Sequence, residues 1–421
     1  MTFAKFHIDP RLQASVKKLG FSKPTPIQSE AIPPILEGKD LVGTARTGTG
    51  KTLAFALPLL NHLLTKPPRM GGKTRALILA PTRELAQQIH ASFQALLPGT
   101  NLRSATVYGG VGFKTQEDAL RRGVEIIVAC PGRLIDHMQA RIADLRYVEA
   151  LVLDEADQMF DMGFLPPLRQ IVSHLPKERQ TLLFSATFAP ELQALIKEVC
   201  RHPVRIDVAG NEPTATVAHA LYPVPHHLKT ALLLKIMEAE TEGTILVFTR
   251  TKHRANKVSE RLEKEGWKTG VLHSNKSQAQ RHRALQGFRN GQIRVLVATD
   301  IAARGIDVAG VTHVINFDIP ESATTYIHRI GRTGRAEKNG DALTLVSRED
   351  QGIVRDIERA LGKPIERREL KEFDYNAAAP QGGGGDSTRS QERQARGQGR
   401  RPSGQGGRPS RSSSQGSGPR R

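Results

Sequence analysis

Short apolar runs rich in β-branched residues alternate with longer amphipathic stretches along most of the chain. The runs lie at 76–80, 124–129, 151–153, 181–184, 244–248, 269–272, 293–298, 311–317 and 342–346. Apolar runs of this length are typical of strands buried on both faces of a parallel sheet, and the stretches between them are long enough for helical crossovers. Because the alternation restarts after residue 216, the pattern predicts an α/β fold with two doubly wound parallel sheets.

The two halves are separated by the segment from Val208 to Thr214, which is short and polar and contains Gly and Pro. Such a segment is typical of an interdomain linker. We therefore expect a first lobe over residues 1–207, a linker over 208–215 and a second lobe over 216–375. Two α/β lobes in tandem predict an interlobe cleft, where ligands of such folds often bind.

Residues 376–421 have the composition of a disordered tail. They contain nine Arg, eleven Gly and two acidic residues, and their only apolar side chains are four Ala. Such a segment cannot bury enough surface to offset the entropy of ordering it. The whole chain carries a formal net charge of +19, which indicates a polyanionic partner, although charge alone is also explained by solubility.

Several classes of protein do not fit the chain. No apolar run approaches the roughly 18 residues needed to span a membrane, and the first eleven residues do not resemble a signal peptide. The only cysteines, Cys130 and Cys200, lack the spacing of a zinc site or a disulfide framework. We therefore expect a cytoplasmic protein without a membrane partner.

The strongest local motif is Ala45-Arg46-Thr47-Gly48-Thr49-Gly50-Lys51-Thr52, followed by an apolar, helix-like stretch. The two glycines allow the backbone amides to face a phosphate, Lys51 can reach the β and γ phosphates, and Thr52 can bind Mg²⁺. A P-loop normally has Gly where this chain has Ala45, and Gly-Lys-Thr also occurs by chance. The motif on its own therefore leaves phosphate binding open.

A second element is the apolar run 151–153, which is followed by Asp154-Glu155-Ala156-Asp157. Carboxylates at the end of a parallel strand are what a P-loop enzyme needs, one to hold Mg²⁺ and one to orient or deprotonate the attacking water. Helix capping would explain one of these carboxylates but not three.

A third element, His328-Arg329-Ile330-Gly331-Arg332-Thr333-Gly334-Arg335, supplies cations at intervals of three. Phosphoryl transfer needs positive charge on the γ phosphate in the transition state. Because this segment lies in the second half of the chain, catalysis would require the lobes to close. A basic surface helix is the simpler interpretation of this segment alone.

Together these motifs resemble the DEAD-box ATP-dependent RNA helicases of superfamily 2, over roughly residues 3–350. Further matches are Phe3 with the segment 20–28, Pro81-Thr82-Arg83-Glu84-Leu85, Gly109-Gly110, Ser185-Ala186-Thr187, Gln278 with Arg281, Ala298-Thr299-Asp300 and Arg304-Gly305-Ile306-Asp307. The resemblance implies two RecA-like lobes, ATP and Mg²⁺ as cofactors, and RNA as the partner. Asn275-Lys276-Ser277-Gln278 and the basic tail look most like the bacterial RhlE-type branch.

The resemblance also implies roles for individual residues. Those expected at the nucleotide are Phe21, Gln28, Ala45, Arg46, Thr47, Gly48, Thr49, Gly50, Lys51, Thr52, Gly305 and Asp307. Those expected in hydrolysis are Lys51, Asp154, Glu155, Arg332 and Arg335, with Thr52 and Asp154 at the metal. Those expected at RNA are Pro81, Thr82, Arg83, Gly109, Gly110, Pro131, Gly132, Arg133, Thr249, Gln278, Arg281, Thr299 and Asp300. Those expected to couple hydrolysis to strand separation are Asp157, Ser185, Thr187 and His328.

Three positions depart from the family pattern. Cys130 stands where the family usually has Thr, which removes a hydroxyl that could meet an RNA phosphate. Arg46 stands where Gln is usual, and Ser274-Asn275 replaces Gly-Asp. None of these changes removes a catalytic group.

We therefore expect local, non-processive unwinding of short RNA duplexes or remodelling of RNA–protein complexes, coupled to ATP binding and hydrolysis. RNA contacts to the backbone would be largely independent of sequence, and the tail would add affinity. Ribosomal or RNA-decay proteins, in ribosome biogenesis for example, are candidate partners. Two alternatives stay open: a translocase on double-stranded DNA, and a non-enzymatic RNA chaperone that acts through its tail.

Overall fold

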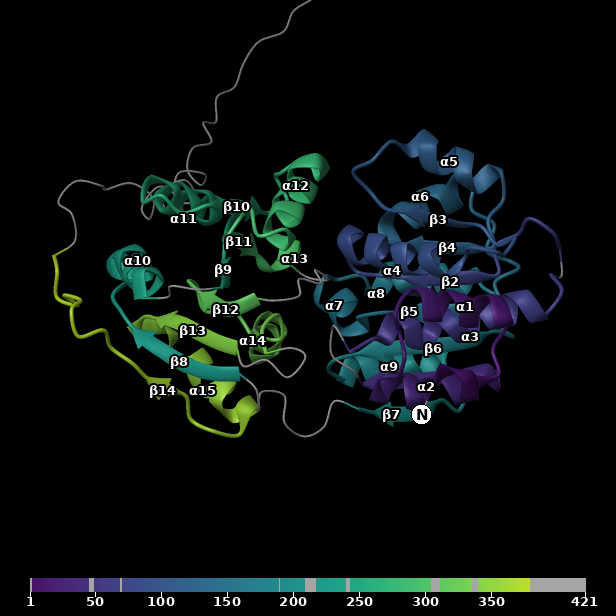
Figure 1. The fold of residues 1–421 in the computed structure, drawn as a ribbon, viewed down its shortest axis with the longest axis horizontal. Helices are drawn as coiled ribbons and strands as arrows, with labels where there is room; N and C mark the ends of the chain where they lie inside the picture. The colour runs from purple at the N-terminus through teal and green to yellow at the C-terminus, as the bar shows by residue number, and fades with distance from the viewer. Residues whose placement is uncertain are drawn as a thin grey trace, which may run out of the picture. The chain divides into compact units, whose positions relative to one another are not determined.

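The computed structural model describes residues 2–44, 49–68, 70–188, 190–208, 217–239, 243–303, 311–334 and 340–378. Two parallel sheets, each with its own flanking helices, make up this part of the chain (Figure 1). We call the first, up to residue 208, the amino-terminal lobe, and the second, from residue 217, the carboxy-terminal lobe. The predicted linker, apart from Val208, and the predicted tail from residue 379 onward lie outside the described residues.

The amino-terminal sheet has seven strands in the order β3-β4-β2-β5-β6-β1-β7, all parallel. The strands are β1 (Leu41–Thr44), β2 (Ala76–Leu79), β3 (Ser104–Val107), β4 (Ile126–Ala129), β5 (Ala150–Leu153), β6 (Gln180–Ser185) and β7 (Val204–Asp207). The helices are α1 (Pro10–Lys18), α2 (Pro26–Leu36), α3 (Lys51–Thr65), α4 (Arg83–Leu96), α5 (Phe113–Arg121), α6 (Pro131–Gln139), α7 (Ala156–Asp161), α8 (Leu165–Ser173) and α9 (Pro190–Val199).

The carboxy-terminal sheet also has seven parallel strands, in the order β10-β11-β9-β12-β13-β8-β14. The strands are β8 (Val217–Pro223), β9 (Thr244–Thr249), β10 (Thr269–Leu272), β11 (Val295–Thr299), β12 (Val311–Asn316), β13 (Gly340–Val346) and β14 (Glu366–Arg367). The helices are α10 (Lys229–Ala239), α11 (Lys252–Lys264), α12 (Gln278–Arg289), α13 (Asp300–Ala303), α14 (Ala323–Ile330) and α15 (Gln351–Leu361).

Both sheets have the same strand order when each is numbered from its own first strand. β8 then corresponds to β1, β9 to β2 and β12 to β5. The prediction of two doubly wound α/β lobes is confirmed, and the two lobes repeat one topology.

The central strands are buried on both faces, as their uninterrupted apolar sequences predict. Every residue of β2 and β4 is 0% exposed. Two apolar clusters cover the two faces of the amino-terminal sheet, one with α3 and α4 and the other with α6, α8 and α9. The polar residues that follow the carboxyl ends of these strands are therefore the candidates for a functional site.

The structure also contains five strands that the apolar pattern did not predict, β1, β3, β7, β8 and β14. β1 is short and contains Gly43, β3 is Ser-Ala-Thr-Val, and β7 alternates in burial at the edge of its sheet. Such sequences lack the continuous apolar run of a central strand, so their pairing is decided by the rest of the sheet. No described helix is long and apolar enough to cross a membrane.

Candidate active site

A cavity of about 580 Å³ lies beside the first turn of α3, lined by residues of the amino-terminal lobe and by Arg289 of α12. Its walls include Phe21, Gln28, Lys51, Asp154 and Glu155, which come from four separate segments of the sequence. The carboxyl ends of β1 and β5 meet at one edge of the sheet. The fold therefore brings together residues of three predicted motifs.

Gln28 fixes the entry to α3. It is 3% exposed, and its Oε1 accepts a hydrogen bond from the Thr25 backbone N–H (2.9 Å), while its Nε2 donates to the Gly50 carbonyl (3.0 Å). Gly50 has φ 92°, and a Cβ there would lie 2.4 Å from the Gln28 Nε2. Only glycine fits this position, because both the backbone angle and the space exclude a side chain. An adenine contact by Gln28, which stays a prediction, would use the second N–H of its amide.

Lys51 is the first residue of α3, and its Nζ lies 3.9 Å from Asp154 Oδ1. The two side chains are 6% and 2% exposed. Burial raises the pKa of Asp154, against the attraction of the Lys51 ammonium and together with the repulsion of Glu155. The Lys51 amine and the Asp154 carboxyl group therefore lie close together, largely shielded from water, at the carboxyl ends of the strands.

Glu155 has a backbone conformation that is rare for a side-chain-bearing residue, with φ 52° and ψ 52°. Its N–H donates to Asp154 Oδ1 (3.0 Å), and its buried Oε2 has no hydrogen-bond partner among the described residues. A strained residue with an unsatisfied carboxylate oxygen in a cavity wall is typical of a functional site.

Asp157 forms a polar cluster with the turn that follows β6. Its Oδ2 accepts hydrogen bonds from the Thr187 N–H (2.9 Å), the Thr187 hydroxyl (3.1 Å) and the Ala186 N–H (3.1 Å). Ser185 donates its hydroxyl to the Thr187 carbonyl. The His328 Nε2 lies 3.3 Å from Asp157 Oδ2, an ion pair when the imidazole is protonated. The four residues predicted to couple hydrolysis to strand separation therefore lie together.

The pKa of Asp157 reflects this cluster. Burial opposes ionisation, but His328, Lys51 and the Thr187 N–H outweigh it and lower the pKa to about 2. Asp157 is therefore an anion at neutral pH, whereas burial pushes Asp154 in the opposite direction.

The residues predicted at RNA in the amino-terminal lobe lie after three neighbouring strands, β2, β3 and β4. Thr82 accepts a hydrogen bond from the Leu85 N–H at the start of α4. Gly110 has φ 82°, and a Cβ there would overlap the Arg83 guanidinium. Arg133 donates to the Val111 carbonyl and lies 3.2 Å from an Asp136 carboxylate oxygen. Of the remaining members, Pro81 and Gly109 follow β2 and β3, and Pro131 and Gly132 are the first two residues of α6.

Phe113, which is 36% exposed at the start of α5, is not among the residues predicted from the motifs. Its ring stacks on His137, with centroids 4.0 Å apart, and the Arg133 guanidinium lies 5.6 Å from the ring centroid. Phe113 therefore helps to hold Arg133 in place. Its sequence signal is weak, since it is a single apolar residue in a polar segment.

Several residues predicted at RNA in the carboxy-terminal lobe already have partners within the protein. Asp300 accepts two hydrogen bonds from Arg329, at 2.6 and 2.7 Å. Arg281, one turn after Gln278 on α12, pairs with Glu84 at 2.9 Å. Thr249 is fully buried and donates to the Thr251 carbonyl, and Thr299 ends β11. An RNA contact by Asp300, Arg281 or Thr249 would therefore have to share or replace these bonds.

Arg332 lies just after α14 and is 3% exposed. The structure does not describe Ala45, Arg46, Thr47 and Gly48 of the predicted P-loop, or Gly305, Asp307 and Arg335. Thr49 and Thr52 are described, and Thr52 lies in the cavity wall.

A lysine at the start of the helix after β1, beside a carboxylate at the end of β5, is the arrangement of a P-loop nucleotide hydrolase. Comparisons with known proteins identify the family. The model of the DEAD/DEAH box helicases matches residues 25–195, and that of the helicase conserved C-terminal domain matches residues 228–337. The ATP-dependent RNA helicase CshA of Listeria monocytogenes is 40% identical over 88% of this chain and 71% of that protein.

Two solved structures have the same fold. Dbp5 of S. cerevisiae, bound to RNA and ADP BeF3, has a TM-score of 0.78 and 29% identity, covering 87% of this chain and 95% of that chain. Mss116p, bound to ssRNA and AMP-PNP, has a TM-score of 0.78 and 28% identity, covering 88% and 80%. The chain belongs to the DEAD-box helicase family, and it is an ATP-dependent RNA helicase and ATP hydrolase.

Proposed function

We propose that ATP binds in the 580 Å³ cavity and is hydrolysed by the residues around Lys51. Lys51 binds the β and γ phosphates, Glu155 orients and deprotonates the attacking water, and Arg332 with Arg335 stabilises the transition state. The observation that carries this assignment is the buried, unsatisfied Glu155 oxygen in the same cavity wall as Lys51 and Asp154.

The side chains present fit a magnesium ion that is bound together with the nucleotide. Asp154 and the Thr52 hydroxyl supply hard oxygen ligands at the cavity wall. No cluster of three or more His, Cys, Asp or Glu in the described residues could hold a metal ion alone. With the nucleotide bound, an ion held by these residues would supply neutralisation of the charge on the phosphates.

The proposed RNA path follows the turns after β2, β3 and β4 and continues over residues Thr249, Gln278, Arg281, Thr299 and Asp300. Close-approach glycines and cations along this edge support it, since Gly110 and Arg83 are in contact and Arg133 is fixed by Phe113. These groups suit phosphates and 2′-hydroxyls better than base edges. Binding is therefore expected to be largely independent of sequence, and the basic tail adds affinity.

We further propose that unwinding is local and non-processive. Asp157, Thr187 and His328 link the turn after β6 to the motif that carries Arg332, so a change at the nucleotide reaches both lobes. Closure would bend bound RNA, and hydrolysis would reset the enzyme.

Measurement of ATP hydrolysis with and without RNA tests this function. RNA should raise the rate, and a rate that RNA leaves unchanged would contradict the coupling. Displacement of short RNA and DNA duplexes is the companion assay. A preference for DNA with processive unwinding would favour the translocase, and annealing that persists without an intact ATP site would favour the chaperone.

Within the family, we propose the bacterial RhlE-type branch and a cytoplasmic role on ribosomal or decaying RNA. The sequence Asn275-Lys276-Ser277-Gln278 and the Arg/Gly-rich tail support the assignment to this branch. The two isolated cysteines suit a reducing compartment. Crosslinking and sequencing of cellular RNA bound to the protein would identify the substrate, and a set without ribosomal or messenger RNA would contradict this role.

A further inference from the structure

The carboxy-terminal lobe has a lysine in the place that Lys51 occupies in the amino-terminal lobe. β8 corresponds to β1 in the shared strand order, and α10 follows β8 as α3 follows β1. Lys229 is the first residue of α10, and Lys51 is the first residue of α3. The common topology therefore aims both side chains at the carboxyl ends of their sheets.

The segments before the two lysines differ in their chemistry. The connection from β8 to α10 is Val224-Pro225-His226-His227-Leu228, which contains no glycine and one residue without an N–H. The amino-terminal connection has Gly48 and Gly50. A loop without glycine cannot curl its amides around a phosphate, so the carboxy-terminal lobe has the lysine without a phosphate cradle.

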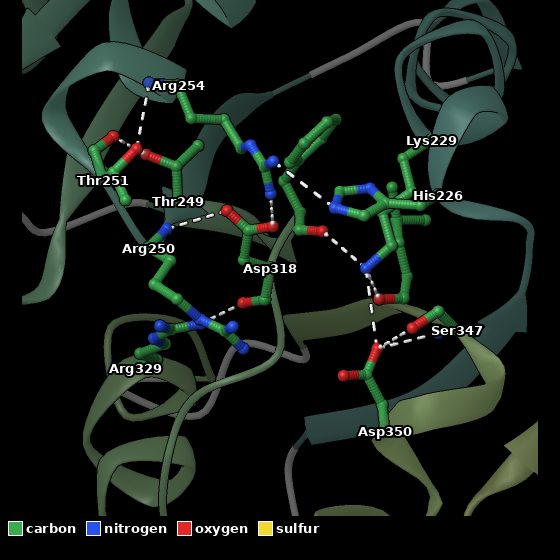
Figure 2. A network of polar contacts seen from close by, with 12 residues as sticks. His226, Lys229, Thr249, Arg250, Thr251, Arg254, Asp318, Arg329, Ser347 and Asp350 are labelled. Carbon is green, nitrogen blue, oxygen red and sulfur yellow. Dashed lines mark hydrogen bonds and ion pairs between the residues drawn. The ribbon is translucent and has the colours of Figure 1, made fainter. Parts of the chain in front are cut away.

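The Lys229 ammonium is used inside the protein instead. It donates to the Leu345 carbonyl at 2.9 Å and to the Phe317 carbonyl at 3.4 Å, and it lies 3.7 Å from Asp350 Oδ2 (Figure 2). Lys229 is 3% exposed. Asp350 is itself fixed, because its Oδ2 accepts hydrogen bonds from the N–H and hydroxyl of Ser347, both at 2.8 Å.

These carbonyls lie at the carboxyl ends of β12 and β13, two neighbouring central strands. Buried carbonyls that lose their donor carry a desolvation penalty. Burial lowers the pKa of Lys229, and the nearby Asp350 and Asp318 carboxylates oppose this shift. The Lys229 ammonium thus satisfies the carbonyls at the ends of these two strands. The corresponding place in the amino-terminal lobe is where phosphates are expected to bind.

The residue after Phe317 connects this point to two predicted functional motifs. Asp318 accepts hydrogen bonds from the Arg250 N–H (2.8 Å) and from the Arg254 guanidinium (2.6 Å). Its carbonyl accepts a 2.6 Å bond from Arg329 on α14 (Figure 2). Arg250 directly follows Thr249, so Asp318 connects the turn after β9 to α14.

Arg329 fixes α14 along the length of β12. Its guanidinium also bonds to Asn316 at the end of β12 and to Asp300. At the other end of the strand, the Thr333 hydroxyl bonds to the Val311 and Thr312 carbonyls. Arg332 lies between these two anchors, so its position depends on the end of β12 that Lys229 holds.

We propose that Lys229 is a positioning residue for ATP hydrolysis. Its ammonium occupies the place where the other lobe is expected to bind phosphate, and it sets the position of Arg332 through Phe317, Asp318 and Arg329. This inference rests on the proposed function, because Arg332 is the group that would meet the γ phosphate. All but one of the residues that line the cavity proposed for ATP belong to the amino-terminal lobe, so ATP binding should depend little on Lys229.

Replacement of Lys229 by Met tests the proposal, because Met keeps the apolar stem and removes the donors. We expect kcat of RNA-stimulated hydrolysis to fall by about tenfold, since small misplacement of a catalytic group is costly. The KM for ATP should stay within about twofold of the wild-type value. Lys235→Met on the same helix is the matched control, since Lys235 is exposed and pairs only with Glu238 among the described residues, and it should leave both constants unchanged.

The assays are run at least 20 °C below the unfolding midpoint of the weakest variant, so that the loss of folded protein does not mimic a loss of kcat. A lower unfolding midpoint with unchanged kcat would show that Lys229 is purely structural and would overturn the proposal. A rise in KM as large as the fall in kcat would overturn it as well.

Asp350→Asn is a second test if Lys229→Met does not fold. It leaves the carbonyl bonds of Lys229 in place and removes the negative charge of Asp350, which also accepts the hydrogen bonds from Ser347, so a decrease in kcat by about threefold, with KM unchanged, is expected. An unchanged kcat in this variant would overturn the proposal. Wild-type protein without RNA-stimulated hydrolysis would instead contradict the proposed function itself.

Discussion

At the scale of single residues, Glu155 has both a strained backbone and a proposed catalytic side chain. Its φ of 52° places a side-chain-bearing residue in the left-handed region directly after β5, at a cost of order 1 kcal/mol. Natural sequences accept such conflicts where function needs a particular side chain. The unsatisfied carboxylate oxygen of Glu155 fits this interpretation.

Glu155→Gln should therefore abolish most of the hydrolysis without unfolding the protein. Gln has the same shape but cannot accept a proton from water, and loss of a general base costs at least about 100-fold in rate. Release of phosphate measures hydrolysis, and binding of a fluorescent ATP analogue shows separately that the variant is folded and still binds nucleotide. Glu37→Gln is the control, since Glu37 is 57% exposed and pairs with Lys39. Hydrolysis near the wild-type rate in Glu155→Gln would contradict the assigned role.

Cys130 stands at a predicted RNA contact but is chemically protected. Burial, together with the nearby Glu84 carboxylate and against Arg83, raises the pKa of its thiol to about 12. Burial also raises the pKa of Cys200 to about 12. The thiolate is the reactive form, so both cysteines are expected to react slowly at ordinary pH.

Alkylation of the native protein by iodoacetamide at pH 8.5 should therefore be slow at both cysteines. A free thiol with a pKa near 8.5 would be about half ionised under these conditions. Mass spectrometry of native and urea-unfolded samples makes the comparison, and the unfolded protein should take two adducts. Rapid addition of one adduct to the native protein would show that a thiol is accessible and ionised.

At the scale of elements, the ends of helices carry much of the functional geometry. Gln28 forms a capping box with Thr25 at the start of α2 and also holds Gly50 before α3. Ser277 and Gln280 form the same motif at the start of α12, near Arg281. In α6, by contrast, the N-cap residue Cys130 makes no side-chain hydrogen bond.

Cys130→Thr should stabilise the protein through this empty cap. A Thr hydroxyl can accept a backbone N–H in the first turn of α6, which is worth about 1 kcal/mol. Chemical denaturation should show a higher midpoint for Cys130→Thr than for Cys130→Ala, the control that has no oxygen. If the two variants unfold at the same midpoint, the hydroxyl does not cap the helix.

The elements also show where prediction from the sequence works. The central strands were predicted because burial on both faces demands continuous apolar sequence, as in Leu77, Ile78 and Val128. Edge strands such as β7 and short ones such as β3 were not, because tertiary pairing outweighs their weak local preference. The Lys51 and Asp154 motifs were visible in the sequence, whereas Phe113 and Asp318 act through contacts that the sequence does not display.

At the scale of the whole molecule, charge and topology have separate roles. The net charge of +19 includes nine Arg and two acidic residues within 376–421, all of which lie outside the described residues. The folded lobes repeat one strand order, and each has its own lysine at the sheet edge. One lysine lies in a cavity wall and the other bonds to backbone carbonyls.

Truncation before Asn376 should weaken RNA binding without changing basal ATP hydrolysis. Arg/Gly segments bind RNA through charge and stacking, so the slope of log K against log salt should fall by about 0.7 for each lost phosphate contact. Titration of labelled single-stranded RNA at several salt concentrations measures this slope. A tail in which every Arg is replaced by Lys separates charge from stacking, and unchanged affinity at low salt in the truncated protein would show that the tail only adds solubility.

The sequence by itself determined the fold class and the reaction, and it supplied the candidate catalytic groups, because apolar periodicity and short phosphate-binding motifs are local properties of the chain. Only the tertiary structure decided which side chains have partners. It engages Asp300 and Arg281 in ion pairs, strains Glu155, and buries Lys229 against two strand ends. These outcomes depend on residues far apart in sequence that meet at the carboxyl edges of the sheets, where strand order, and not local pattern, sets the neighbours.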